Sequence, residues 1–298
     1  MVVVEEKPAR LAVGVVGVGR VGAALAAALG LAGHHVVAAS GVSETSRRRA
    51  ENLLPGVPLM DPAGVLARSD LVLLTVPDDA LPALVKGLAE TGAVRPGQLV
   101  VHTSGRYGTA VLDPALRAGG LPLALHPAMT FTGTAVDVQR LVGCPFGVTA
   151  PDALRMAAEA LVIEMSGEPE WIEESARPLY HAALAIGANH LVTLVAQSMD
   201  LLREAGVAEP GRMLGPLLGA ALDNALRSGD AALTGPVARG DASTVSAHLR
   251  ELRLHAPEAV ASYVAMARAT ADRALANGML KAEYAEALLG ALADDGTR

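Results

Sequence analysis

The chain has 298 residues, of which 51% are hydrophobic and 2% aromatic, and its net charge is −7. This length allows two domains, while the scarcity of aromatic residues excludes a stacking platform for single-stranded nucleic acid. Because the charge is negative and no long Lys/Arg run occurs, we expect no nucleic acid and no anionic membrane as partner.

The N-terminal ten residues are acidic and lack the cationic and apolar regions of a secretory signal. The apolar stretches 11–39 and 179–202 are each interrupted by polar or charged side chains, so neither resembles a clean transmembrane span. The single Cys144 cannot form an internal disulfide, which fits a reducing compartment. We therefore expect a soluble, cytoplasmic protein.

The first elements are a strand over residues 11–16, a glycine-rich turn, a helix to about residue 31 and a strand over residues 35–39. The turn reads G-x-G-x-x-G, and this order of elements predicts a dinucleotide cradle at the helix N-terminus. The alternative is a turn in an α/β protein that binds no nucleotide. The expected contacts to a pyrophosphate are Gly17, Gly19, Arg20, Val21 and Gly22.

The second strand is followed by residues that favour NADP over NAD, although NAD stays possible. An NAD-binding protein typically has Asp or Glu there, whereas this chain has Ser40 and Ser43, then three consecutive arginines from Arg47. Hydroxyls and a guanidinium can bind a 2′-phosphate by charge-assisted hydrogen bonds. The other reading of the arginines is a solvated helix face.

Further apolar runs predict strands over residues 71–76 and 98–102, one ending at His126, and one within "CPFGVTA". Near-continuous apolar strands indicate a mostly parallel, doubly wound sheet covered on both faces. Ligands of such sheets bind at the carboxyl ends of the strands, where His126 would face the cleft. The alternative for each is a turn or cap residue. The expected cofactor contacts there are Val76, Pro77, Thr103 and Ser104.

From about residue 151 the pattern becomes helical, apart from a loop at residues 229–242. We expect a Rossmann-like α/β domain over residues 1–168 and an all-α domain over residues 169–298. "GEPEWIEE" at the boundary indicates a last short strand or a link.

A long apolar helix beginning at Arg177 contains His181, Asn189 and His190. In an α-helix His181 and Asn189 would lie about 80° apart around the axis and about 12 Å apart along it. They share a broad face and are candidates to line a cleft, whereas His190 points elsewhere. The alternative is hydrogen bonding between helices or across a dimer contact.

The stretch "LTGPVARGD" predicts a tight polar loop in which Arg239 is the candidate ligand for a substrate carboxylate. Asp241, Ser243 or Thr244 can cap the helix that follows. A plain loop is the alternative.

Six motifs together resemble the superfamily of 6-phosphogluconate dehydrogenase, ketopantoate reductase and pyrroline-5-carboxylate reductase. More closely, the chain resembles a family with a Rossmann-like domain followed by a helical domain of unknown function. The motifs are "GVVGVGRVG", "LTVPDD", "HTSG", "HPAMTF", "YHAALAIGANHLV" and "LTGPVARGD".

The resemblance implies an oxidoreductase whose better-known relatives use a Lys and an Asn one turn apart on the first helix of the second domain. If Asn189 matches that Asn, Ala185 occupies the Lys position, so the mechanism does not transfer directly. His181, one turn earlier, is the candidate to replace the Lys as general acid, since histidine titrates near neutral pH.

The leading hypothesis is an NADP(H)-dependent reductase of a small carbonyl or imine that bears a carboxylate, with a ketopantoate-type 2-oxo acid as best guess. His181 would donate the proton, with His126 as runner-up, while Asn189 positions the reactants and Arg239 holds the carboxylate. The alternatives are a nucleotide-binding sensor without chemistry and a methyltransferase with a similar turn. No metal site is predicted, and the apolar helices predict a homodimer.

Overall fold

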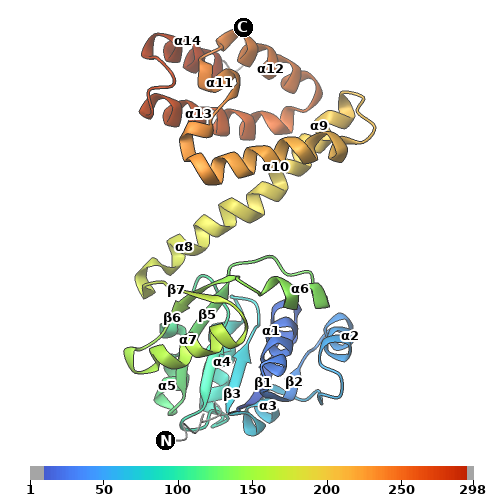
Figure 1. Ribbon diagram of the computed structural model, residues 1–298, viewed down its shortest axis with the longest axis vertical. Helices are drawn as coiled ribbons and strands as arrows, with labels where there is room; N and C mark the ends of the chain where they lie inside the picture. The colour runs from blue at the N-terminus through green and yellow to red at the C-terminus, as the bar shows by residue number, and fades with distance from the viewer. Residues whose placement is uncertain (1–9, 294–298) are drawn as a thin grey trace, which may run out of the picture. The chain divides into compact units, whose positions relative to one another are not determined.

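The computed structural model describes residues 10–293 and divides into two compact units, one up to Asn189 and one from His190 (Figure 1). The division falls later than the expected boundary at residue 168. The reason is that Glu168–Trp171 forms a strand of the sheet and that the helix after it is anchored to the sheet through the buried Arg177. Composition alone did not indicate that these residues stay with the first unit.

The first unit contains a seven-stranded sheet with the order β2-β1-β3-β4-β5-β6-β7. Neighbouring strands are parallel except β5 and β6, which pair antiparallel. The strands are β1 (Ala12–Val16), β2 (His35–Ser40), β3 (Leu71–Leu74), β4 (Leu99–His102), β5 (Leu121–Pro127), β6 (Pro145–Thr149) and β7 (Glu168–Trp171). The expected mostly parallel sheet is confirmed, and its antiparallel pair was not foreseen because apolar composition carries no information on strand direction.

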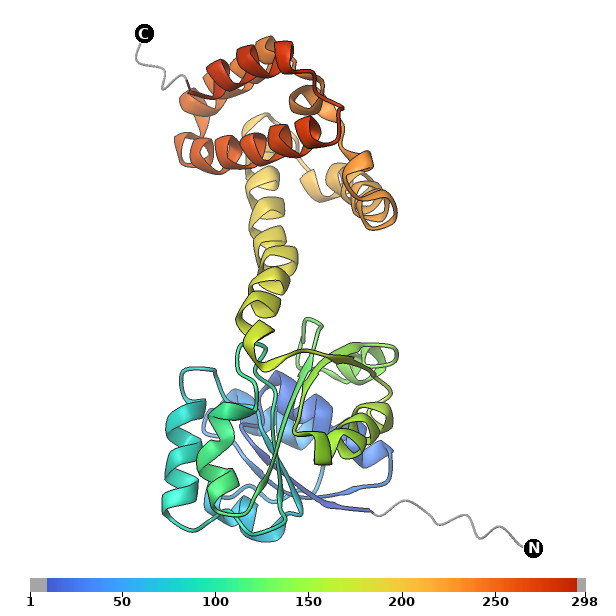
Figure 2. The ribbon, with the colours of Figure 1, turned by 90° about the vertical axis from the view of Figure 1, so that its left-hand side faces the viewer.

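Helices cover both faces of this sheet, so the expected doubly wound fold is confirmed (Figure 2). One core cluster joins α1 and α7 to one face, and the other joins α3 and α4 to the opposite face. The helices are α1 (Arg20–Leu31), α2 (Glu44–Leu53), α3 (Pro62–Arg68), α4 (Leu81–Glu90), α5 (Asp113–Arg117), α6 (Ala135–Arg140) and α7 (Arg155–Glu164).

The strand order places a topological switch between β1 and β3. The chain runs outward from β1 to β2 and then returns to β3 on the other side of β1. In open α/β sheets ligands bind in the crevice beyond the carboxyl ends of the strands at such a point. The glycine-rich turn after β1 lies there.

After β7 the chain enters α8 (Arg177–Leu184), continues through a π-helical turn (Ala185–His190) and then forms α9 (Leu191–Glu204). The sequence predicted one regular α-helix here, so the π-turn is a correction. Its extra residue in one turn changes which side chains share a face, and π-turns of this kind occur frequently at functional sites.

The second unit is helical and has its own core, which includes Val245, Leu249, Ala271 and Leu288. Its helices are α9 (Leu191–Glu204), α10 (Pro210–Ser228), α11 (Gly235–Arg239), α12 (Ala242–His255), α13 (Val260–Ala276) and α14 (Ala282–Ala293). The expected loop at residues 229–242 contains a short 3-10 turn and α11, because Gly235 and Gly240 adopt the positive φ angles that begin and end that helix.

One helix of the described chain, Glu174–Glu204, is long and apolar enough to cross a membrane by length and composition. Its mean hydropathy is 1.4, and none of its most apolar window is buried. A single helix of this kind is weak evidence for a membrane protein, since a helix covered by protein passes the same test. The side chains exposed on it include Leu179, Ile186 and Val192.

Candidate active site

The glycine-rich turn adopts the geometry expected of a dinucleotide cradle. Gly17 has φ +95°, and an added Cβ there would lie 2.8 Å from the Thr75 carbonyl oxygen. The amides of Gly17 and Val18 donate to the Ser40 carbonyl at 3.0 and 2.8 Å, which joins the turn to the end of β2. Only glycine fits the first position of this turn.

The space beside Gly19 is open, whereas the space beside Gly22 is closed. A Cβ on Gly19 would meet nothing nearer than the Gly17 oxygen at 3.8 Å, but a Cβ on Gly22 would lie 2.2 Å from Thr75 Oγ1. Gly22 therefore lets α1 pack against the strands, and Gly19 leaves room for a ligand. Gly19 is the N-cap of α1 and has no capping side chain, so the first amides, those of Arg20, Val21 and Gly22, can donate to a phosphate.

The three arginines of α2 have different surroundings. Arg47 is exposed, and Arg48 pairs with Glu44 at 3.2 Å. Arg49 is half-buried, and its Nε atom has no hydrogen-bond partner among residues 10–293. The side chains of Arg49 and Arg20 both lie against Gly133, where a Cβ would be 2.5 Å from Arg49 Nε and 3.1 Å from Arg20 Cγ. The structure thus makes Arg49, which the sequence did not single out, a neighbour of the turn.

The serines expected to bind the 2′-phosphate have structural contacts. Ser40 is buried and holds the turn through its carbonyl oxygen. Ser43 is the N-cap of α2, since its Oγ accepts from the Ser46 amide at 3.1 Å. Their role toward a cofactor stays a prediction.

Four further residues expected at the cofactor follow β3 and β4. Val76 and Thr103 are half-buried, Pro77 is exposed and Ser104 is buried. Ser104 Oγ accepts from the amides of Arg106 and Tyr107, each at 3.2 Å, so this hydroxyl organises its own turn. Their contact with a cofactor also stays a prediction.

A cluster of aromatic and imidazole side chains lies at the end of β5. His126 Nδ1 is 2.8 Å from the Tyr180 hydroxyl, and the His126 and His181 ring centroids are 6.1 Å apart. His126 comes from β5, whereas Tyr180 and His181 are consecutive residues of α8. The structure therefore brings together the two histidines that the sequence had proposed separately.

Two glycines of the sheet unit provide the space for this cluster. A Cβ on Gly105 would lie 2.8 Å from His181 Cδ2 and 3.0 Å from His126 Nε2. A Cβ on Gly147 would lie 2.6 Å from the Tyr180 hydroxyl. Residues larger than glycine at either position would push α8 or its side chains away from the sheet.

Burial and nearby charge keep His126 neutral. Burial, followed by the charges of Arg177, His181 and His102, lowers the pKa of His126 to about 4. Burial raises the pKa of Tyr180, so its hydroxyl stays protonated and shares with Nδ1 a hydrogen bond whose direction depends on the His126 tautomer. When Tyr180 donates, the proton of neutral His126 is on Nε2, which faces Gly105, and His126 can donate a hydrogen bond from that atom.

Beneath this cluster, His102 is fully buried and neutral. Burial lowers the pKa of His102 to about 4, although its hydrogen bond to Gly108 O acts in the opposite direction. Its Nδ1 accepts from the Ser104 amide at 3.1 Å, and its Nε2 lies 2.8 Å from Gly108 O. His102 therefore fixes the turn after β4.

The π-turn places Asn189 on the same face as His181. Because one extra residue is accommodated, the eight residues between them cover the arc of about seven, about 700°, which leaves the side chains about 20° apart. Both residues line one cavity of about 480 Å³ together with His126. The other lining residues are Ala128, Met129, Thr130, Ala183, Leu184, Ala185, Gly187 and Ala188.

Arg239 belongs to the second unit, where it is exposed at the last position of α11. Asp241 Oδ1 accepts from the Thr244 amide at 3.0 Å, so Asp241 caps α12, as the sequence allowed. The function of Arg239 toward a carboxylate stays a prediction.

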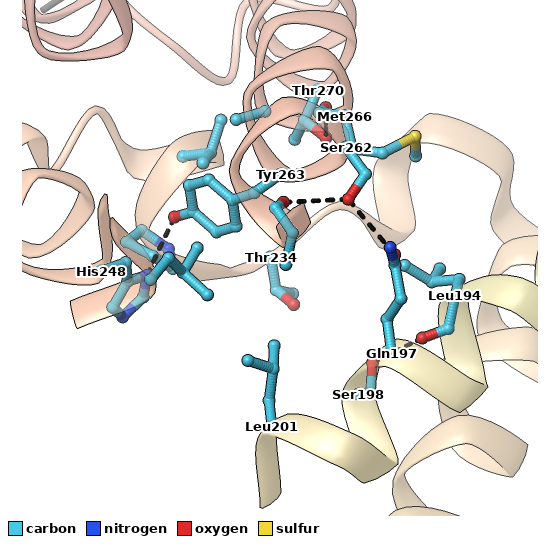
Figure 3. A pocket seen from close by; sticks show the side chains of 15 residues that line it. Leu194, Gln197, Ser198, Leu201, Thr234, His248, Ser262, Tyr263, Met266 and Thr270 are labelled. Carbon is cyan, nitrogen blue, oxygen red and sulfur yellow. Dashed lines mark hydrogen bonds between the residues drawn. The ribbon is translucent and has the colours of Figure 1, made fainter. Parts of the chain in front are cut away.

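The start of the "LTGPVARGD" motif contributes to a second cavity, of about 350 Å³, within the helical unit (Figure 3). Thr234 lies among side chains of α9 and α13, and His248 Nδ1 is 2.9 Å from the Tyr263 hydroxyl. The residues that line it include no Asp, Glu, Lys or Arg. His248 is therefore the lining side chain that could become a cation and pair with a carboxylate.

Sequence reasoning missed Arg177, Tyr180, His102 and Gly105. Tyr180 precedes His181 directly, but its hydrogen-bond partner His126 lies on β5, so no pattern within the helix indicated it. His102 and Gly105 flank the predicted strand end "HTSG", but no sequence pattern indicated which of these residues is buried. Arg177 began the helix that had been singled out, yet its burial depends on two strands and a turn that are distant in sequence.

These features define a dinucleotide-binding α/β unit followed by a helical unit. Residues 3–127 match the family model of the Rossmann-like domain, and residues 144–270 match that of a domain of unknown function, DUF2520. Together the two models span most of the chain in the order that the motifs predicted, which confirms the resemblance. No curated protein sequence matches it.

Solved structures share this fold. A protein assigned as an NADP oxidoreductase from Bacteroides fragilis is 22% identical, with a TM-score of 0.72, over 88% of this chain and 98% of that chain. A Plasmodium falciparum pyrroline carboxylate reductase with NADP bound is 12% identical, with a TM-score of 0.58, over 93% and 98%. An imine reductase from Pseudomonas sp. is 19% identical, with a TM-score of 0.57, over 95% and 100%.

Proposed function

We propose that the protein is an NADP(H)-dependent reductase of a small imine or carbonyl compound that bears a carboxylate. The observation that carries the proposal is a cavity lined by His126, His181 and Asn189 in the same unit as the glycine-rich turn. Both features follow carboxyl ends of parallel strands, which lie along one edge of the sheet. The structures named above as NADP oxidoreductase, pyrroline carboxylate reductase and imine reductase support the reaction class.

The residues present fit a dinucleotide. The space beside Gly19 is open, and the first amides of α1 can donate to its phosphates. A nicotinamide dinucleotide, when bound, supplies the hydride for the carbon of a C=N or C=O group. Arg20, Arg47 and Arg49 contribute positive charge near the turn, and no carboxylate within ion-pair distance neutralises them among the described residues.

Side chains of the protein would supply the proton that the substrate nitrogen or oxygen takes up during reduction. As the carbon is reduced, the electron pair of the double bond moves to nitrogen or oxygen, and a protonated His181 gives its proton to that atom. His126 is unsuited to donate this proton because, with its pKa lowered to about 4, its protonated form is scarce at neutral pH. It would instead donate a hydrogen bond from Nε2, and Asn189 would orient the reactants. Arg239 is proposed to bind the carboxylate.

The substrate is proposed as a cyclic imine or a small carbonyl acid. Two of the structures named above are enzymes whose names specify a pyrroline or an imine as substrate, which supports the imine arm. The ketopantoate-type 2-oxo acid expected from the sequence has no such support, and it is tested as the alternative substrate.

The test is titration with NADPH and NADH by fluorescence, followed by NADPH consumption against cyclic imines with and without a carboxylate and against 2-oxo acids. We expect binding of NADPH and turnover with at least one carboxylate-bearing imine or carbonyl. Failure to bind either nucleotide would contradict the proposal.

A sensor that binds the dinucleotide without chemistry is the second candidate, because Ala185 occupies the position where the resemblance implies a lysine. Binding of NADPH without consumption of any substrate class would favour it. The same two measurements therefore separate the candidates.

We also propose that a second copy covers the exposed apolar side chains of α9 and α10. Val192 and Leu194 on α9 are exposed by 69% and 43%, and α10 exposes Met213, Leu217, Leu222 and Leu226. Exposed apolar side chains gathered on two helices are typical of interaction sites, and a homodimer in the cytoplasm would bury them. Light scattering should give the mass of a dimer, and Leu217→Glu combined with Leu226→Glu should give that of a monomer. A monomeric wild-type protein would refute this part.

A further inference from the structure

The side chain of Arg177 is fully buried at the first position of α8. Its Nε donates to Thr149 Oγ1 at 2.8 Å, and Nη1 donates to Ser104 O at 3.3 Å. Its Nη2 donates to Ala124 O at 3.0 Å and to Gly147 O at 2.9 Å. One guanidinium thus joins the start of α8 to β5, to β6 and to the turn after β4.

All four acceptors of this guanidinium are neutral oxygens. Among residues 10–293 no carboxylate lies within ion-pair distance of Arg177. Glu174 is the carboxylate that acts on it electrostatically, but Glu174 Oε2 accepts from the Thr109 amide at 2.7 Å and Oε1 from the Ala110 amide at 3.2 Å. Although burial lowers the pKa of Arg177 to about 10, the group stays charged at neutral pH. A buried charge of this kind is costly, so its retention suggests a role beyond packing.

Besides the hydrogen bond between Tyr180 and His126, the contacts that hold α8 on the sheet unit include three at successive positions, and Arg177 makes the first. The second is the Tyr180 ring against Gly147, and the third is the His181 ring against Gly105. Arg177 also lies 5.9 Å from the Tyr180 ring centroid. The residue that anchors the helix therefore sits one turn before the two side chains that meet His126.

We propose that Arg177 is a positioning residue of the His126–Tyr180–His181 cluster. It fixes the first turn of α8 against the sheet and keeps a positive charge beside His126, so that His126 stays a neutral hydrogen-bonding group next to His181. The catalytic part of this inference rests on the proposed reductase function, whereas the structural and electrostatic part does not.

The groups that face His126 come from three elements. Arg177, Tyr180 and His181 belong to α8, His102 belongs to β4, and the Gly105 backbone follows β4. Protonation of His126 would place a second cation beside Arg177. It would also make both ring nitrogens N–H donors, so that Nδ1 could no longer accept a hydrogen bond from the Tyr180 hydroxyl. Removing the Arg177 charge should therefore make His126 easier to protonate, although burial, the largest cause of its low pKa, would remain.

The test is an NMR titration of the imidazole signals, assigned to His126 by comparison with His126→Asn, in the complete protein. In the wild type we expect His126 to titrate near pH 4, and in Arg177→Met we expect its pKa to rise by at least one unit. Arg177→Lys retains the charge and should leave the pKa low. Thr149→Val removes one acceptor of Arg177 but not its charge, so it is the matched control and should also leave the pKa low.

A wild-type His126 pKa of about 6 or above would overturn the inference, as would an unchanged low value in Arg177→Met. If Arg177→Met does not fold, Arg177→Lys decides: a value within half a unit of the wild type supports the inference, and a rise of a unit or more refutes it. The acid limb of the pH profile for NADPH consumption should move with the His126 pKa. Because the titration needs no turnover, loss of the proposed function would leave the NMR result intact and distinguishable.

Discussion

The glycine-rich turn and the histidine cluster lie at the same edge of one sheet but are built in different ways. The turn uses backbone: the conformation of Gly17, the open space at Gly19 and the close packing at Gly22. The cluster uses side chains from β5 and α8, anchored by Arg177 to oxygens of four separate residues. A backbone site of six consecutive residues is specified locally, whereas a side-chain site depends on the tertiary fold.

The two sites should accordingly respond differently to mutation. A change in the turn should weaken nucleotide binding strongly, since only glycine fits its close contacts. A change in the cluster should remove turnover and leave nucleotide binding intact. The predictions below test this separation, from the largest expected effect to the smallest.

His181→Ala should lower turnover by about 100- to 10,000-fold, the usual contribution of a positioned proton donor. NADPH affinity should stay unchanged, because the turn is untouched. Steady-state NADPH consumption and a fluorescence titration provide the two measurements. His190→Ala, at the end of the same π-turn, is the matched control and should retain activity. Equal turnover in wild type and His181→Ala would exclude His181 as the donor.

Gly22→Val should weaken NADPH binding by about 100-fold, since its Cβ would lie 2.2 Å from Thr75 Oγ1 and 2.6 Å from Gly17 O. Gly30→Ala is the control within the same helix, because its Cβ would meet Val36 Cγ2 only at 3.7 Å. That change should leave binding intact and stabilise α1 by up to about 1 kcal/mol. Equal NADPH affinity for Gly22→Val and wild type would contradict the proposal that the glycine-rich turn binds the dinucleotide.

The first unit should lose stability as the pH falls from about 6.5 toward 4. Folded His102 has a pKa of about 4, below its unfolded value of 6.5, so the unfolded chain takes up the proton first. The stability is fully present above pH 6.5, and the loss reaches about 3 kcal/mol at pH 4. His126 acts in the same direction.

Denaturant unfolding followed by the fluorescence of Trp171, the single tryptophan, measures this unit. His102→Gln should flatten the slope of stability against pH, whereas substitution of the exposed His35 should not change it. An unchanged slope in His102→Gln would show that His102 does not titrate in this range.

Arg47→Ala and Arg49→Ala should each reduce the preference for NADPH over NADH by about tenfold, because a hydrogen bond to a charged group contributes about 1.5 kcal/mol or more. Arg48→Ala, which removes only the exposed pair with Glu44, should have no such effect. Nucleotide titrations of the three variants compare them directly. If all three variants keep the wild-type preference for NADPH over NADH, Arg47 and Arg49 do not bind the 2′-phosphate.

The elements of the first unit could be predicted because their signals are local. The apolar runs gave the strands around β1 to β5 within one or two residues, and the G-x-G-x-x-G spacing gave the start of α1. The stretch "GEPEWIEE" allowed a last short strand, which is β7, but the antiparallel pairing of β6 and the division after Asn189 depend on contacts between distant segments, so no local pattern predicted them.

The candidate site was predictable only in part. His126, His181 and Asn189 stood out as polar residues in apolar surroundings, and they line one cavity. Their relative placement requires the π-turn, which hydrophobic periodicity does not reveal. Arg177, with neutral partners on three segments, looked like an ordinary helix-start residue.

The wall of the histidine-lined cavity consists largely of the smallest side chains. Ala183, Ala185, Gly187 and Ala188 line it together with His126 and His181. Enlarging one of these positions would narrow the space without touching His126 or His181. Substrate size in this protein could therefore be retuned from one helical turn, leaving the proton-handling groups as they are.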